Sequence, residues 1–192
     1  MTESILRSLI HMAGGLIPFI AILAGLKITL TLIAATSALY CLSESLRLKG
    51  GKIPVVTELT LRASRASEPK DRLILKPLFF ATGIAVTLAF FPRPASYAAV
   101  MVLALGDGGA SLLGGFLGRT AIPFNPEKTV EGSLSGFMLA FLGALLFVNP
   151  IYALVGVFIG MLVEALPIPL DDNLAVPLAS AFAFLLLLQL NF

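Results

Sequence analysis

The chain has 192 residues, of which 58% are apolar and only 12% are charged. Soluble domains carry about 25% charged residues, so 13 basic and 11 acidic side chains are too few to cover a soluble globule of this length. The composition predicts an integral membrane protein with one domain over residues 1–192 and the lipid bilayer as its surroundings. The net charge of +2, without a basic run among aromatic residues, argues against nucleic acid as a partner.

Seven apolar segments follow one another along the chain, separated by charges, prolines or glycine clusters. A membrane-spanning helix needs about 20 mostly apolar residues. The segments cover residues 10–26, 28–42, 73–91, 95–118, 133–148, 151–166 and 174–190. The sequence therefore predicts an all-α bundle of about seven transmembrane helices. Because no small-residue cleavage site follows the first segment, we expect no signal peptide.

The charges are distributed unevenly across this predicted topology. Seven spans place the N-terminus and the polar segments 43–72, 119–131 and 167–173 on one side of the membrane. Of the 13 basic residues, all except Lys27 and Arg93 fall on that side, which the positive-inside rule assigns to the cytoplasm. The 11 acidic residues lie there too, or in spans that open to it. We therefore expect any chemistry to take place at the cytoplasmic face.

The segment GDGGASLLGGFLGR, residues 106–119, combines glycine with an acidic residue inside an apolar span. An ionised carboxylate in a bilayer is costly unless it faces water or a partner, so Asp107 is a candidate functional residue. Ser111 and glycines share its helix face and would leave a path to the cytosol. In the alternative interpretation, Gly114 and Gly118 form a helix-packing face in which Asp107 is a polar contact.

A second polar group precedes the fifth apolar segment. Thr129 fits a helix N-cap, with Glu131 and Ser133 in the first turn. The free N–H groups of such a terminus, with Lys128 beside them, also suit a phosphate, and both interpretations can hold together. The carboxylates that could hold Mg²⁺ against phosphates are those of Asp107, Glu131, Asp171 and Asp172.

Further polar residues lie near the predicted cytoplasmic ends of other spans. Arg7 and His11 are four residues apart and project from one helix face. The histidine could contact phosphate or act as a base, or it could be an ordinary polar residue at the interface. Glu44 and Arg47 share a face at the end of the second span, and Glu164 lies near the end of the sixth.

The last polar turn holds adjacent acids between prolines, in the segment PIPLDDNLAVPL at residues 167–178. Asp171, Asp172 and Asn173 fit either a ligand site or an Asx-type loop that caps the seventh helix. The chain contains no P-loop, no protein-kinase signature and no GxGxxG after a strand. A nucleotide would therefore be held in another way.

Three of these segments, taken in order, resemble the CTP-dependent polyprenol kinase family, which includes dolichol kinase, phytol kinase and the yeast-type CTP-dependent diacylglycerol kinase. The segments are LGDGGASLLGGFLGR, EKTVEGS and DDNLAVPL. The opening LRSLIHMAGGLIP, the ESLR of residues 44–47 and Glu164 extend the resemblance over nearly the whole chain. The resemblance implies transfer of the γ-phosphoryl group of CTP to the hydroxyl of an isoprenoid or related lipid alcohol, with Mg²⁺, in a helical membrane bundle.

The resemblance and the chemistry of phosphoryl transfer together suggest roles for the polar residues. Asp107 with Asp171 or Asp172 would hold the metal, and Lys128 and Arg119 would bind the phosphates. The alcohol's tail would stay in the bilayer and enter laterally between spans, while CTP arrives from the cytosol.

The remaining candidates would support the metal or complete the pocket. Glu131 would assist the metal or deprotonate the alcohol. The nucleotide and polar pocket would be completed by Arg7, His11, Thr129, Asn173, Glu44, Arg47, Ser111 and Glu164.

Two other functions remain open at this point. A cytidylyltransferase of the same superfamily would transfer CMP to a phosphorylated lipid, although DDNLAVPL is more similar to the kinase branch. A small transporter would also place acids in a membrane, but no inverted repeat is visible in the chain. The identity of the lipid alcohol and the oligomeric state do not follow from the sequence.

Overall fold

The computed structural model describes residues 2–64 and 70–190, and within them the chain is almost entirely helical. Residues 65–69, which belong to the predicted polar segment 43–72, lie outside this described part. The helical elements are α1 (Thr2–Ala13), η1 (Gly14–Leu16), α2 (Ile17–Ala24), α3 (Leu26–Leu48), α4 (Pro54–Ala63), α5 (Lys76–Phe90), α6 (Arg93–Met101), η2 (Val102–Asp107), α7 (Gly108–Leu117), α8 (Val130–Ala144), α9 (Pro150–Ala165) and α10 (Asp172–Leu190). A two-stranded antiparallel hairpin, β1 (Ala121–Ile122) and β2 (Asn125–Thr129), joins α7 to α8.

Each predicted apolar segment is helical, which confirms an all-α membrane protein. Four stretches are long and apolar enough to cross a membrane, namely Ser4–Ala24, Leu26–Leu48, Arg93–Leu117 and Asp172–Leu190. Helices α5, α8 and α9 are apolar but shorter. Seven crossings and a cytoplasmic N-terminus therefore stay predictions. The polar segments hold two elements that hydropathy did not predict, helix α4 and the β1–β2 hairpin.

Local sequence explains where several helices begin. Pro54, Pro77 and Pro150 occupy the first turns of α4, α5 and α9, where a missing N–H costs nothing. The side chain of Asn149 caps α9 by accepting from the backbone N–H of Tyr152 at 2.9 Å. The prolines and the Asn149 cap thus fix where these helices begin.

The core is built mainly on α6, η2, α8, α9 and α10, where many alanines and valines pack around a few larger side chains. On α6, Ala98, Ala99 and Val100 are fully buried, and on α10 the ring of Phe184 is buried against Gly156 of α9, where a Cβ would clash with the ring. Close backbone approach at small residues is how helices associate in lipid. Most of η2, a π-helical turn that ends at Asp107, is buried in this core, so the acidic residue follows directly from a buried part of the bundle.

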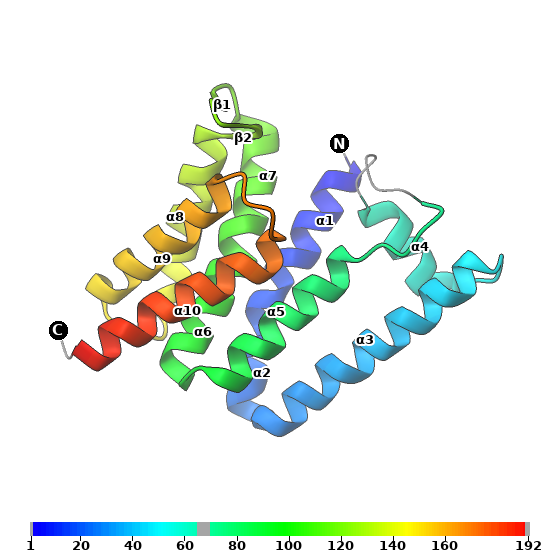
Figure 1. Cartoon of the computed structure of the whole chain (residues 1–192), viewed down its shortest axis with the longest axis horizontal. Helices are drawn as coiled ribbons and strands as arrows, with labels where there is room; N and C mark the ends of the chain where they lie inside the picture. The colour runs from blue at the N-terminus through cyan, green and yellow to red at the C-terminus, as the bar shows by residue number, and fades with distance from the viewer. Residues whose placement is uncertain (1, 65–69, 191–192) are drawn as a thin grey trace.

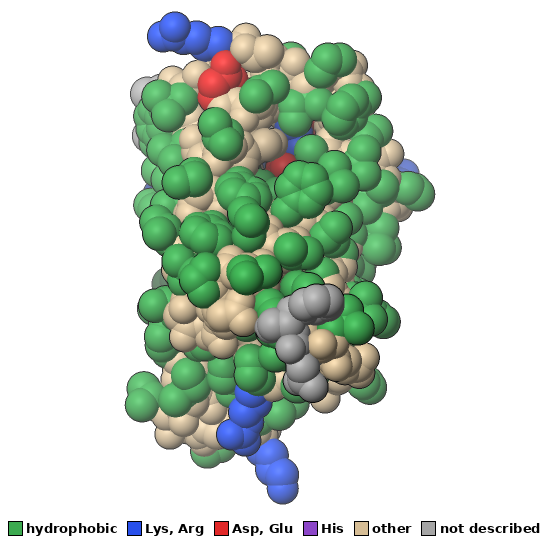
Figure 2. All heavy atoms as spheres, turned by 90° about the vertical axis from the view of Figure 1, so that its left-hand side faces the viewer, with side chains coloured by type: hydrophobic (Ala, Val, Ile, Leu, Met, Phe, Trp, Pro, Cys, Tyr) green, Lys and Arg blue, Asp and Glu red, His purple; other side chains and the backbone are tan. Residues whose placement is uncertain are grey.

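The arrangement separates a polar end from an apolar flank. In Figure 1 the hairpin, the start of α1, helix α4 and the α9–α10 connection lie toward the upper side, and the turn between α2 and α3 lies toward the lower side. Figure 2 shows a flank covered with hydrophobic side chains and basic residues near its two ends. Large apolar side chains such as Leu23 and Phe90 are 86% and 79% exposed, as expected of a surface that faces lipid.

Candidate active site

Two polar pockets lie next to each other and share Arg7, Asp107 and Ser111. The first, called here the His11 pocket, has a volume of about 160 Å³, and its polar lining consists of Arg7, Ser8, His11, Thr60, Ser64, Lys76, Asp107, Ser111, Asp171, Asp172 and Asn173. The second, the Lys128 pocket, has a volume of about 260 Å³ and is lined by Arg7, Asp107, Ala110, Ser111, Gly114, Gly115, Glu127, Lys128, Thr129, Gly132, Ser133 and Glu164. Asp107 therefore lies where the two pockets meet.

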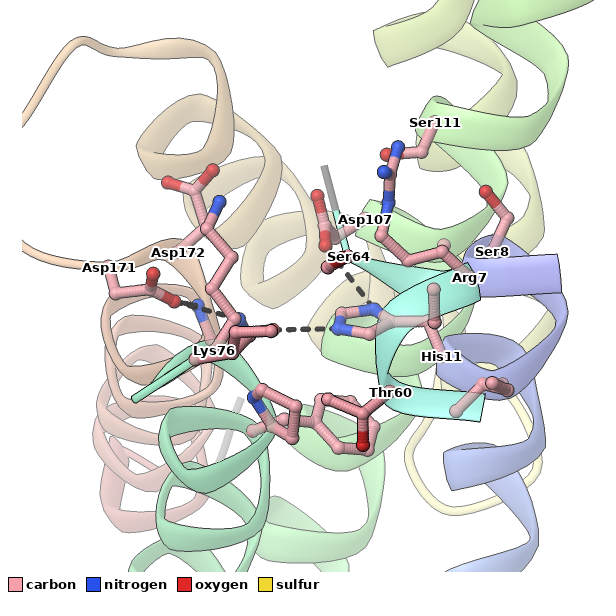
Figure 3. Close-up of a pocket in the computed structure, with 17 residues that line it drawn as sticks. Arg7, Ser8, His11, Thr60, Ser64, Lys76, Asp107, Ser111, Asp171 and Asp172 are labelled. Atoms are coloured by element: carbon pink, nitrogen blue, oxygen red, sulfur yellow. Dashed lines mark hydrogen bonds and ion pairs between the residues drawn. The ribbon is translucent and has the colours of Figure 1, made fainter. Parts of the chain in front are cut away.

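A chain of polar contacts fixes the imidazole of His11 beside Asp107 (Figure 3). The side-chain amide of Asn173 donates to Asp171 Oδ1 at 2.7 Å, which turns its oxygen toward His11. That oxygen accepts from His11 Nε2 at 2.7 Å, and His11 Nδ1 lies 3.3 Å from Asp107 Oδ2. These contacts join α1, η2 and the start of α10, elements that are far apart in the chain. His11 is thereby held by the Asn173 amide oxygen and lies beside the Asp107 carboxylate at the boundary of the two pockets, and its Nδ1 makes no hydrogen bond within the described residues.

The His11 pocket also has an apolar wall and one unsatisfied hydroxyl. The ring of Phe80 on α5 lies 4.2 Å from the His11 ring, centroid to centroid, and Ile74 and Pro77 continue this wall. Ser8 is only 1% exposed, and within the described residues its hydroxyl has no hydrogen-bond partner. Burying a hydroxyl without a partner costs free energy, which a polar group of a ligand in the pocket would recover.

In the Lys128 pocket, the ammonium of Lys128 lies between two carboxylates. Its Nζ is 2.8 Å from Glu164 Oε1 and 2.7 Å from Asp172 Oδ2, and it also contacts the Glu164 carbonyl oxygen. Burial disfavours the charged form, but the charges and hydrogen bonds of the two acids outweigh burial and raise the pKa of Lys128 above its usual value. The lysine thus stays charged and offsets part of the negative charge of the two acids.

The wall of the Lys128 pocket is made where α7 and α8 approach closely. Thr129 is the N-cap of α8, as predicted, and accepts from the N–H of Gly132 at 3.2 Å. A Cβ on Gly132 would lie 2.8 Å from Thr129 Oγ1 and 2.9 Å from the Ala110 carbonyl oxygen, closer than a methyl group can pack. Gly114 faces Gly132 and also lines the pocket. Gly114 therefore packs against α8 and also lines the pocket that reaches Asp107, and a path to the cytosol stays a prediction.

Among the predicted site residues, Glu131 and Arg119 do not reach either pocket. The carboxylate of Glu131 accepts from the backbone N–H groups of Arg119 and Thr120, each at 3.1 Å, and from the Thr120 hydroxyl at 2.9 Å. These hydrogen bonds, that from the Arg119 N–H foremost, lower the pKa of Glu131 to about 2. The Arg119 side chain is exposed. Glu131 thus fastens the start of the hairpin to α8. Neither Glu131 nor the Arg119 side chain is placed to take part in chemistry in the two pockets.

Glu44 and Arg47 form the predicted pair, but they too lie outside both pocket linings. Arg47 Nε donates to Glu44 Oε1 at 2.7 Å, and Glu44 Oε2 accepts from the backbone N–H of Ile74 at 3.1 Å. Arg47 also donates to the carbonyl oxygen of Arg72 at 2.7 Å. The pair therefore fastens the end of α3 to the segment before α5, whose Ile74 lines the His11 pocket.

Three of the acids proposed for Mg²⁺, Asp107, Asp171 and Asp172, line the His11 pocket without forming a cage. Among the described residues, no three His, Cys, Asp or Glu side chains converge as they would around a protein-held ion. Asp172 is paired with Lys128 and Asp171 with Asn173. Because Mg²⁺ usually takes one or two carboxylates together with phosphate oxygens, this set fits a metal that arrives with a nucleotide.

Several pocket residues were missed by the sequence reasoning. Thr60 lies on α4 and Ser64 follows its last residue, and hydropathy does not predict this helix. Lys76 entered the sequence argument only as one of the basic residues that predict membrane orientation. Phe80 entered only as an apolar residue of the predicted span 73–91. Neither a motif nor a spacing distinguishes them, because α4 and α5 reach the pocket only through tertiary packing.

Comparisons with known proteins match most of the chain. Residues 63–188 match the model of the cytidylyltransferase family. The chain is 30% identical to phytol kinase 1, chloroplastic, of Arabidopsis thaliana, over 94% of this chain and 66% of that protein. It is 36% identical to probable phytol kinase 2, chloroplastic, of Oryza sativa subsp. japonica, over 61% and 44%. It is 27% identical to farnesol kinase, chloroplastic, of Arabidopsis thaliana, over 68% and 48%.

The matched region covers only part of these plant proteins, from 44% to 66% of their lengths. No solved structure matches the chain.

Proposed function

Because the chain belongs to the CTP-dependent polyprenol kinase family within the cytidylyltransferase superfamily, we propose that it transfers the γ-phosphoryl group of CTP to the hydroxyl of a prenyl alcohol. Relatives named phytol kinase and farnesol kinase support this substrate class. The observation that carries the proposal is the position of Asp107, where a pocket with an apolar wall meets a pocket lined by glycine, threonine and lysine.

The Lys128 pocket is the proposed site of the nucleotide phosphates. Gly114, Gly115 and Gly132 let a phosphate approach the backbone, and the N-terminus of α8 with Thr129 and Lys128 favours negative charge there. Mg²⁺ bound with the nucleotide would neutralise phosphate charge, held by Asp171 and Asp172 of the adjoining His11 pocket, of which Asp172 also contacts Lys128.

The His11 pocket is the proposed site of the alcohol's hydroxyl. The alcohol oxygen would attack the γ-phosphorus, the bond from that phosphorus to the β-bridging oxygen would break, and CDP would leave. Asp107 would accept the alcohol's proton, and His11, whose Nε2 donates to Asn173, lies beside this carboxylate. Phosphoryl transfer depends mainly on such positioning and on charge stabilisation. We propose that both pockets open to the cytoplasmic side, as the distribution of basic residues indicates.

Labelled nucleotide tests the reaction with purified protein in detergent. CTP labelled at the γ-phosphorus should transfer its label to geranylgeraniol or phytol, and CTP labelled in cytosine should not. Cytosine label in the lipid product would show a cytidylyltransferase instead, and no labelled lipid from any prenyl alcohol would overturn the proposal. ATP, GTP and UTP in parallel test the choice of donor.

A further inference from the structure

The His11 pocket is too small to hold a long lipid alcohol. Its volume is about 160 Å³, whereas pockets that enclose a drug-sized ligand have volumes of about 300–1,000 Å³. An alcohol whose hydroxyl lies beside Asp107 therefore keeps most of its chain outside. We propose that the pocket encloses the first isoprene unit against Phe80, and that the rest of the chain leaves for the bilayer past Ile10 of α1 and Pro77 of α5, called here the lateral exit. This inference rests on the proposed function.

The lateral exit consists of the pocket residues that reach the surface of the bundle. Among the described residues that line the His11 pocket, only Ile10 and Pro77 are exposed, and both are apolar. Ile10 is 44% exposed and lies in Ser4–Ala24, a stretch long and apolar enough to cross a membrane. The pocket lining therefore reaches the surface at a place that faces lipid when the bundle is in a bilayer.

The side of the pocket that meets the Lys128 pocket does not suit an apolar chain. Arg7, Asp107 and Ser111 lie there and belong to both linings. In Figure 3, Asp107 and Ser111 lie above the ring of His11. An apolar chain at this side would displace water from polar groups without replacing its hydrogen bonds. The chain is therefore directed away from the Lys128 pocket and toward the lateral exit.

Phe80 gives the pocket a fixed apolar surface close to the reacting hydroxyl. Its ring lies 4.2 Å from the His11 ring, centroid to centroid. The tip of the ring reaches Gly14, where a Cβ would lie 2.5 Å from Phe80 Cζ, so only glycine allows this approach. Held between His11 and Gly14, the ring offers close contact to the carbon atoms next to the hydroxyl, including the methyl branch of the first isoprene unit.

The lateral exit acts on alignment more than on affinity. Since lipid is as apolar as the exit, the chain gains little free energy by lying there. Contact of the first isoprene unit with Phe80 and passage of the chain past Ile10 instead hold the hydroxyl in the orientation that the transfer needs. Because the later units lie in the bilayer, prenyl alcohols of different length should be phosphorylated with similar kcat.

Narrowing the lateral exit from α1 tests this inference. Ile10→Trp places a large ring at the exit, whereas Leu9→Trp alters the preceding residue, which is 51% exposed but does not line the pocket. Prenol consists of the first isoprene unit alone and needs no exit. We expect the ratio of kcat/KM for geranylgeraniol to kcat/KM for prenol to fall about tenfold in Ile10→Trp and to be unchanged in Leu9→Trp. Equal losses on both alcohols, or equal effects of the two substitutions, would overturn the inference.

A labelling experiment separates this inference from the proposed function. A geranylgeraniol analogue with a diazirine in its second isoprene unit should label the wild type at Ile10 or Pro77, and unmodified geranylgeraniol should compete with that labelling. Label elsewhere in a protein that phosphorylates the alcohol overturns the lateral exit but leaves the kinase. Label at the exit of a protein that phosphorylates no alcohol supports the exit and overturns the kinase. Absence of both label and phosphorylation overturns both.

Discussion

The two polar pockets differ in how the chain builds them. Nearly all of the Lys128 pocket comes from one continuous stretch, η2 to the first turn of α8, to which Arg7 and Glu164 are added. The His11 pocket takes side chains from α1, α4, α5, η2, α7 and the start of α10. The site proposed for the phosphates is therefore encoded mostly by a local segment, while the site proposed for the alcohol depends on the whole bundle. Substitutions should therefore affect one pocket and not the other, except at shared residues such as Asp107.

Asp107→Asn should have the largest effect, because it removes a charge from both pockets at once without changing side-chain size. We expect kcat to fall about a thousandfold, with little change in thermal stability. Activity with γ-labelled CTP and a melting curve measure the two quantities. Asp71→Asn is the matched control, since Asp71 is an exposed acid that lines neither pocket. Comparable activity in the two variants would remove Asp107 from the chemistry.

Lys128→Met should affect the Lys128 pocket first and should also destabilise the protein. The substitution leaves Glu164, which is buried, and Asp172 without the cation between them, and removing one partner of a buried ion pair costs about 3 kcal/mol. The double variant Lys128→Met with Glu164→Gln should recover part of the melting temperature but not the activity. A double variant no more stable than Lys128→Met would contradict the charge explanation.

Gly83→Ala should disturb the His11 pocket and leave the Lys128 pocket intact. Gly83 on α5 lies against the backbone of Asn173, so that a Cβ would clash with the Asn173 carbonyl oxygen. We expect a loss of about 2 kcal/mol in stability, together with a raised KM for the alcohol and an unchanged KM for CTP. Gly115→Ala is the stability control, because nothing lies within 4 Å of its Cβ position. An equal rise in KM for the alcohol and for CTP would contradict the assignment of the two substrates to different pockets.

Much of the fold could be predicted from hydropathy, because each long apolar run must become a helix when lipid surrounds it. Helix α4 and the hairpin could not, since they lie in polar segments where composition carries no such signal. The N-cap at Thr129 and the close packing at Gly114 could be predicted because they depend on residues near one another in the chain.

The geometry of the His11 pocket could not be predicted from the sequence. His11 and Asn173 were each candidates, but nothing in the sequence predicts that their side chains meet at 2.7 Å across a separation of 162 residues. Lys76 and Ser64 carry no signal at all, because their place depends on how α4 and α5 pack. For an acidic residue beside a helix N-terminus, the sequence position suggests a catalytic role that the structure does not support. Only the structure shows that its side chain accepts backbone hydrogen bonds and has a structural role.

Glu131 is that acidic residue, and it sets the smallest predicted effect. Glu131→Gln should lower the melting temperature slightly at neutral pH and leave kcat near the wild-type value, because the side chain holds Arg119 and Thr120 and not a ligand. The pKa of Glu131 falls from 4.5 to about 2 on folding, so its stabilising effect is complete above pH 4.5 and is lost as the pH falls toward 2. The difference in melting temperature between wild type and Glu131→Gln should shrink over that window. Thr120→Val, which removes one of the donors, should not add fully to Glu131→Gln. A loss of kcat as large as that of Asp107→Asn would instead show that Glu131 takes part in catalysis. The active site would then include a residue outside the lining of the Lys128 pocket.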